Sequence, residues 1–165
     1  MSCEELKRLS KSELLKTFNK EIKAAEDFIK EEMENRKKEW ERYEELSISY
    51  IRYSFLSQMM RAVERNGDHE KAIKISKQLE ELKRTFKERF GLTLKELKAA
   101  LNSDPLKDLN NLRNLINKYK RRYDEMVYEG YGTVQKVTEE FLIEAIANIR
   151  RAVMKIRGSQ DTAPS

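Results

Sequence analysis

Apolar residues recur every three or four positions along most of the chain, the spacing of a helix with one buried face. No Gly or Pro occurs before Gly67, so nothing in the sequence interrupts the first of these patterns. We therefore expect one long helix over about 12–64; a kink near residues 35–38 is compatible with the sequence, although nothing in it requires one. Its first part carries a single apolar stripe, made of Leu15, Phe18, Ile22, Ala25 and Ile29.

The segment from Leu46 to Met60 differs from the rest, because its apolar residues lie on two sides of the helix. Arg52 is its only charged residue, in a chain of which 38% is charged. A helix that is apolar on two sides needs cover on both. We expect this segment at the centre of a bundle or in a subunit interface. One stripe is Leu46, Tyr50, Tyr53, Ser57 and Met60, and the other is Ile48, Ile51, Phe55 and Met59.

Turn and capping residues divide the remainder of the chain into shorter helices. Residues 1–9 are polar and expected to be loose, and 158–165 read as a disordered tail. The sequence thus predicts an all-α fold, a helical bundle forming one domain over residues 1–157. The later helices are expected at about 69–89, 94–101, 105–127 and 133–157, with Asp68, Thr93, Asp104 and Thr133 as their N-terminal caps.

Length and composition bound the class of protein. The 165 residues carry a net charge of +5, from 34 Lys and Arg against 29 Asp and Glu. This excess is compatible with a polyanionic partner without requiring one. No apolar run reaches the ~18 residues of a membrane span, and no secretory signal is present, so we expect a cytoplasmic protein without membrane contact.

Candidate chemistry is restricted by the scarcity of metal-binding and nucleophilic side chains. The chain has one His and one Cys, far apart in sequence, which speaks against a zinc site or a nucleophile activated by imidazole. Carboxylates remain: Glu140 and Glu144 lie four apart on one helix, and with Glu125 they could hold Mg²⁺ or Mn²⁺ for phosphodiester cleavage. The alternative is that all three are solvated surface charges. No other cofactor is expected.

Cations interleaved with aromatic residues favour binding of single-stranded nucleic acid, because cations hold phosphates while aromatic rings stack on unpaired bases. Two stretches fit, one around Trp40 and one from Lys118 to Tyr123. Tyr119 and Tyr123 also fit the spacing of a helix core, which leaves a purely structural reading open. The candidate nucleic-acid-binding residues are Arg36, Lys37, Arg42, Arg52, Lys118, Lys120, Arg121 and Arg122.

Several short motifs resemble the translin/Trax family. They are Glu41-Arg42 with Leu46, Ser49 and Ile51-Arg52; the segment 66–72; Lys120–Asp124; Gly130-Tyr131; and Glu140–Ala145. The resemblance implies an all-α protein that binds single-stranded RNA or DNA and forms closed multimers, and in the Trax branch a metal-dependent ribonuclease. The Trax carboxylates are spaced Glu-x-x-Glu, whereas Glu140 and Glu144 are one residue further apart.

Three hypotheses about function follow. The leading one is a multimerising helical protein without catalysis that binds single-stranded nucleic acid, with RNA preferred. The second is a ribonuclease of the Trax type, dependent on Mg²⁺ or Mn²⁺. The third is a structural bundle that binds a protein partner, such as a small helical subunit of a larger nucleoprotein complex. Under each, a homo-oligomer or an obligate protein partner is expected to cover part of the segment from Leu46 to Met60.

Overall fold

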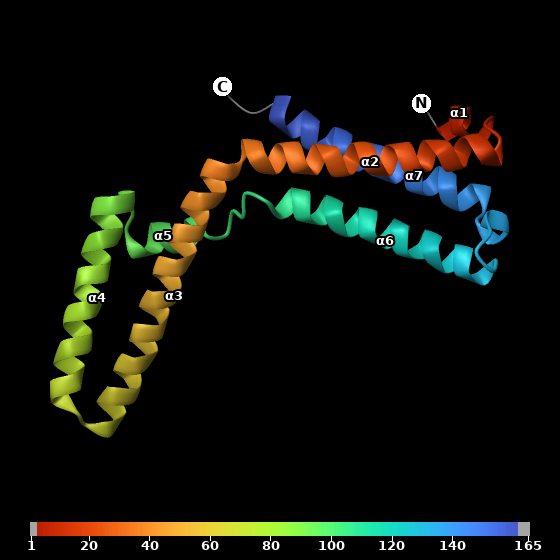
Figure 1. Cartoon of the computed structure of the whole chain (residues 1–165). Coiled ribbons are helices and arrows are strands. Elements are labelled where there is room, and N and C mark those ends of the chain that lie inside the picture. Colours follow the sequence, from red (N-terminus) through yellow and green to blue (C-terminus); the bar gives the residue numbers. More distant parts are fainter. Residues whose placement is uncertain (1–2, 162–165) are drawn as a thin grey trace. The chain divides into compact units, whose positions relative to one another are not determined.

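The computed structural model describes the backbone of residues 3–161 and the side chains of residues 3–158. Over this range the chain is all-α, as predicted, and forms two compact units. Unit 1 contains α1, α2, α6, η1 and α7, and unit 2 is residues 36–105, with α3, α4 and α5 (Figure 1). The expected single domain stays a prediction. The elements are α1 (Cys3–Lys7), α2 (Lys11–Asn35), α3 (Lys37–Asn66), α4 (His69–Phe90), α5 (Leu94–Ala100), α6 (Lys107–Glu129), the 3-10 turn η1 (Val134–Lys136) and α7 (Glu139–Asp161).

Unit 1 is built from three long helices, in which α2 packs against α7 and α6 packs against both (Figure 1). Leu14, not the expected Leu15, begins the buried stripe of α2. An ion pair links α2 to α7: Arg150 Nε lies 2.9 Å from Glu21 Oε2, with only 23% and 21% of the two side chains exposed. The buried face of α7 includes Phe141, Leu142, Ala145, Ile149 and Val153, and Val137 in the preceding loop is also buried.

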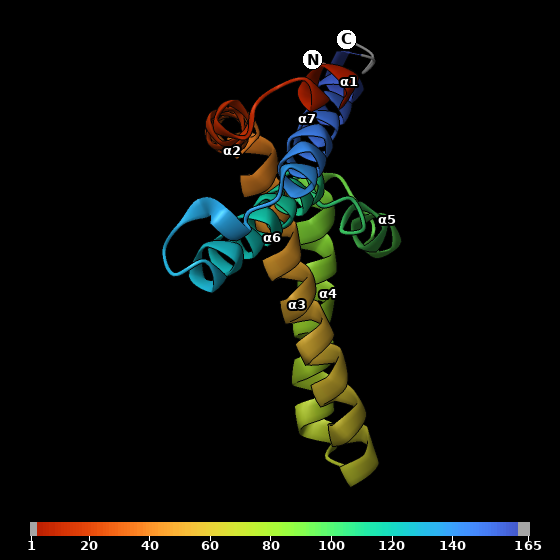
Figure 2. The same ribbon diagram turned by 90° about the vertical axis from the view of Figure 1, so that its right-hand side faces the viewer.

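Unit 2 is a hairpin of α3 and α4, which lie side by side in both views, with the short α5 packed against each (Figures 1 and 2). The turn has the predicted chemistry. Gly67 adopts φ 72°, which an L side chain rarely adopts, and the Asp68 carboxylate accepts a hydrogen bond from the Lys71 amide at 3.2 Å. Buried Leu46, Phe86 and Leu97 form the core of the unit. Ile73, also on α4, is 58% exposed.

The expected continuous helix over 12–64 is divided at Arg36, inside the stretch 35–38 where the sequence allowed a kink without requiring one. This residue has φ −97° and ψ 9°, so that α2 ends at Asn35 and α3 begins at Lys37. Its guanidinium donates from Nη1 to the carbonyl of Pro105 at 2.8 Å. Since no Gly or Pro marks the break, we attribute it to contacts with a segment far away in sequence, which the local pattern cannot reveal.

Three boundaries also differ from expectation. Residues 3–7 form α1 instead of a loose end, because Leu6 is fully buried on unit 1. The helix expected from 105 starts at Lys107, and Leu106 stands at its N-cap position instead of Asp104. The helix expected over 133–157 is divided: Thr133 caps only η1, and the Thr138 hydroxyl accepts from the Phe141 amide at the start of α7.

Helix α7 continues to Asp161, so residues 158–161 are not the expected disordered tail, and residues 162–165 lie outside the described residues. None of the described helices combines the length and the apolar character needed to cross a membrane.

The core of unit 2 gives a first prediction. Phe86 on α4 has no exposed surface and packs with Leu46 of α3 and Leu97 of α5. Phe86→Ala should lower the free energy of unfolding by about 3–5 kcal/mol, through lost burial and the cavity left behind. Ile73→Ala on the same helix is the control and should cost less than about 0.5 kcal/mol, as a surface substitution. Urea unfolding followed by circular dichroism measures both, and equal losses would contradict the described core.

Candidate functional site

The cations of α6 face different neighbours instead of forming one basic patch. Lys120 Nζ lies 3.5 Å from Glu26 Oε1 on α2, whereas Arg122 Nη1 lies 3.1 Å from Glu125 Oε2 on its own helix. Lys118 Nζ sits 5.9 Å from the centre of the Tyr119 ring. Among the described residues, the Arg121 side chain makes no hydrogen bond or ion pair. Three of the four predicted phosphate-binding side chains thus already have an intramolecular partner.

The two tyrosines of this stretch pack on unit 1, where Tyr119 is buried and Tyr123 is half-buried. Tyr119 is 5% exposed, and its hydroxyl accepts a hydrogen bond from Asn148 Nδ2 at 2.6 Å. The ring of Tyr123 stacks on Phe18 with 5.2 Å between ring centres. The Tyr119 ring is therefore buried, and the half-buried Tyr123 ring has one face against Phe18. The structural reading that the sequence left open applies to both residues.

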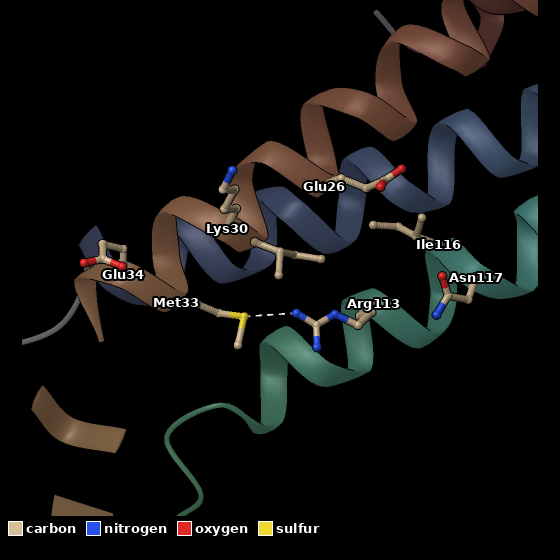
Figure 3. A pocket seen from close by; sticks show the side chains of 8 residues that line it. Glu26, Lys30, Met33, Glu34, Arg113, Ile116 and Asn117 are labelled. Atoms are coloured by element: carbon tan, nitrogen blue, oxygen red, sulfur yellow. Dashed lines mark hydrogen bonds between the residues drawn. The ribbon is translucent and has the colours of Figure 1, made fainter. Parts of the chain in front are cut away.

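A groove of about 550 Å³ runs between α2 and α6, close to these residues (Figure 3). Its lining includes apolar Ile29 and Ile116 together with charges of both signs. Across it, Arg113 Nη2 lies 3.0 Å from Met33 Sδ, drawn as the dashed line in Figure 3. The charged lining residues are Glu26, Lys30, Glu34 and Arg113. Their charges cancel, so the groove does not attract polyanions.

The four cations predicted on the long first helix all lie in unit 2, and one has a structural role. Arg36 is half-buried and donates to the Pro105 carbonyl, while nearby the Tyr43 hydroxyl donates to the Leu101 carbonyl at 3.1 Å. These two bonds fix the segment 101–105 to the start of α3. The side chains of the other three, Lys37, Arg42 and Arg52, are exposed and make no hydrogen bond or ion pair among the described residues.

The candidate metal ligands are not assembled into a site. Glu140 and Glu144 are exposed on the first turns of α7, and Glu125 is engaged by Arg122 on α6. Across residues 3–158, no group of three or more His, Cys, Asp or Glu side chains lies close enough together to hold a metal ion. The described geometry thus gives the three carboxylates no shared ligand position.

One side of α3 presents several apolar residues in a line; we call it the α3 apolar face and define it as Ile48, Ile51, Phe55, Met59 and Ala62. The large residues among them are strongly exposed: Ile48 60%, Ile51 66%, Phe55 61% and Met59 40%. The opposite side of the helix is in the core, where Tyr50 and Tyr53 pack with Leu46 against α4 and α5. The two predicted stripes are thus real, and unit 2 covers one of them.

Comparisons with known proteins add no family. No family model matches the chain, and neither a curated protein nor a solved structure does. The translin/Trax resemblance therefore stays a prediction.

The contact made by Arg36 gives a second prediction. Arg36→Ala should lower the free energy of unfolding by about 1.5–3 kcal/mol, the usual value of a hydrogen bond from a charged donor. Lys37→Ala removes an equal charge from the neighbouring exposed position and should cost less than about 0.5 kcal/mol. Thermal and urea unfolding of the full chain measure the difference. Two equal, small effects would show that Arg36 is an ordinary surface cation.

Proposed function

We propose that the protein is an assembly module without catalysis, which binds a protein partner through the α3 apolar face. The observation that carries the proposal is the exposure of Ile48, Ile51 and Phe55, each about 60% or more, in one line along a helix. Isolated apolar residues on a surface are ordinary, but a contiguous apolar patch rimmed by polar residues marks an interaction site.

The form of this face indicates the form of its partner. Its residues follow steps of three and four, the pattern by which one helix packs along another. From Ile48 to Ala62 the face extends over about 21 Å, at 1.5 Å per residue. It is a ridge on a rigid hairpin and not a pocket, which suits a second helix with its own apolar face better than a small ligand.

Binding of single-stranded RNA is the second candidate function, and the distribution of charge supports it. Unit 2 has 16 Lys and Arg against 12 Asp and Glu, whereas the rest of the chain has 18 against 17. Almost all of the positive excess therefore belongs to unit 2, together with the exposed cations Lys37, Arg42 and Arg52. Such an excess favours a polyanion, and a protein scaffold and an RNA contact are compatible on one unit.

Methionine oxidation tests the leading proposal without assuming which partner is bound. Met59 lies on the α3 apolar face, and Met154, 68% exposed on α7, is an internal reference. In cells that produce the full chain, Met59 should react with peroxide several times more slowly than in the Phe55→Glu variant, where the added charge prevents docking. Mass spectrometry of the peptides measures both rates.

The reference residue and one outcome complete this test. Met154 should react equally in the two proteins, and circular dichroism should show the same helix content. A Met59 that reacts as fast in the wild type as in Phe55→Glu would show that nothing covers the face, and would remove the proposal.

A salt series on RNA binding tests the second candidate. If Lys37 and Arg42 each contact one phosphate, replacing both by Ala should flatten the slope of log affinity against log salt by about 1.4, at ~0.7 per contact for a single strand. Lys20→Ala with Lys23→Ala removes the same charge from α2 and should leave the slope unchanged. Filter binding measures it. Equal slopes in all three proteins would exclude this contact, and absence of binding would exclude the candidate.

A further inference from the structure

The α3 apolar face has a spacing that reads the same in both directions. From Ile48 to Ala62 its residues are separated by three, four, four and three positions, with Phe55 at the centre. Ile48 and Ala62 lie seven residues on either side of Phe55, and Ile51 and Met59 lie four residues on either side. In two antiparallel helices related by a two-fold axis at Phe55, each of these positions lies opposite its counterpart in the second copy. The pattern is thus compatible with its own reversed copy.

We propose that the partner of the α3 apolar face is a second copy of this chain, with the two α3 helices antiparallel about a two-fold axis at Phe55. This inference rests on the proposed function and names its partner. In this register Ile48 faces Ala62 of the second copy, so that a large side chain meets a small one. Ile51 faces Met59, whose flexible chain adapts to an irregular gap. The two Phe55 rings meet at the axis.

The charges at the two ends of α3 also favour the antiparallel pair. Residues 41–45 contain three Glu and one Arg, whereas residues 61–65 contain two Arg and one Glu. An antiparallel pair brings the acidic end of each helix to the basic end of the other. Complementary ends of this kind select orientation more than they add affinity.

Cysteine cross-linking distinguishes the two orientations. In a full-length Cys3→Ser background, we introduce Ile51→Cys and Met59→Cys into separate proteins. Antiparallel pairing brings position 51 of one copy against position 59 of the other, but separates the two copies of position 51 by about 12 Å along the axis. Disulfides need α-carbons within about 7 Å. Mild oxidation should therefore link a mixture of the two proteins, and link neither protein alone.

Each other result has a defined meaning. A disulfide dimer of the Ile51→Cys protein alone would show a parallel pair and overturn the inference. No disulfide at all, with Met59 still protected from oxidation in the wild type, would assign the face to a different protein. The inference would then fail while the proposed function stands. With Met59 unprotected as well, both fail. Met154→Cys, on unit 1, serves as the control for random collisions and should not link to either protein.

Discussion

A helix that is apolar on two sides can be satisfied only by two covering layers, and unit 2 supplies one. Leu46, Tyr50 and Tyr53 turn inward to Phe86 and Leu97, which holds α3 to α4 and α5. The same contact leaves Ile48, Ile51 and Phe55 pointing outward, because a straight helix cannot bury two opposite stripes against neighbours that lie on one side of it. The exposure of the second stripe is thus a geometric consequence of forming the first core.

The exposed stripe has a further property that a random apolar surface would lack, namely rigidity. Its residues are fixed on a helix of 30 residues, which is held along its other side and capped by the left-handed Gly67. A partner that packs on a preformed ridge loses little of its affinity to ordering the chain. The groove between α2 and α6 differs in this respect. Its lining includes long, exposed charged side chains such as Lys30 and Arg113, whose rotamers a ligand would have to fix.

The sequence predicted several local features correctly, although the caps expected at Asp104 and Thr133 were not those of the long helices that follow. Asp68, Thr93 and Gly67 act within one helical turn, so their roles could be read from spacing, and the two stripes of α3 follow from helical periodicity alone. The break at Arg36 could not be read in this way, since it accompanies a hydrogen bond to Pro105, 69 positions further on. The same limit applies to α1, which becomes ordered because Leu6 finds the core of unit 1.

The candidate site divides along the same line. A motif of alternating cations and tyrosines has the composition of a nucleic-acid site, yet composition does not say which way a side chain points. Tyr119 and Tyr123 face the core because their spacing matches the buried stripe of α6, and that spacing was visible. The ion pairs of Lys120 and Arg122 could not be predicted in this way. Glu26, the partner of Lys120, lies on α2, and Glu125, the partner of Arg122, lies one turn further along α6. Only tertiary structure separates engaged cations from available ones.

The bond between Arg36 and Pro105 has a consequence for how the molecule is made. It joins the first and last residues of unit 2, so this unit is an insertion whose two ends meet at one guanidinium. On the ribosome, residues 36–105 are complete before α6 and α7 emerge, whereas α2 must wait for both. Unit 2 can thus fold first and, by closing its own ends, return the growing chain to the place where it departed. An insertion closed in this manner is also the kind that evolution can exchange or delete as a whole.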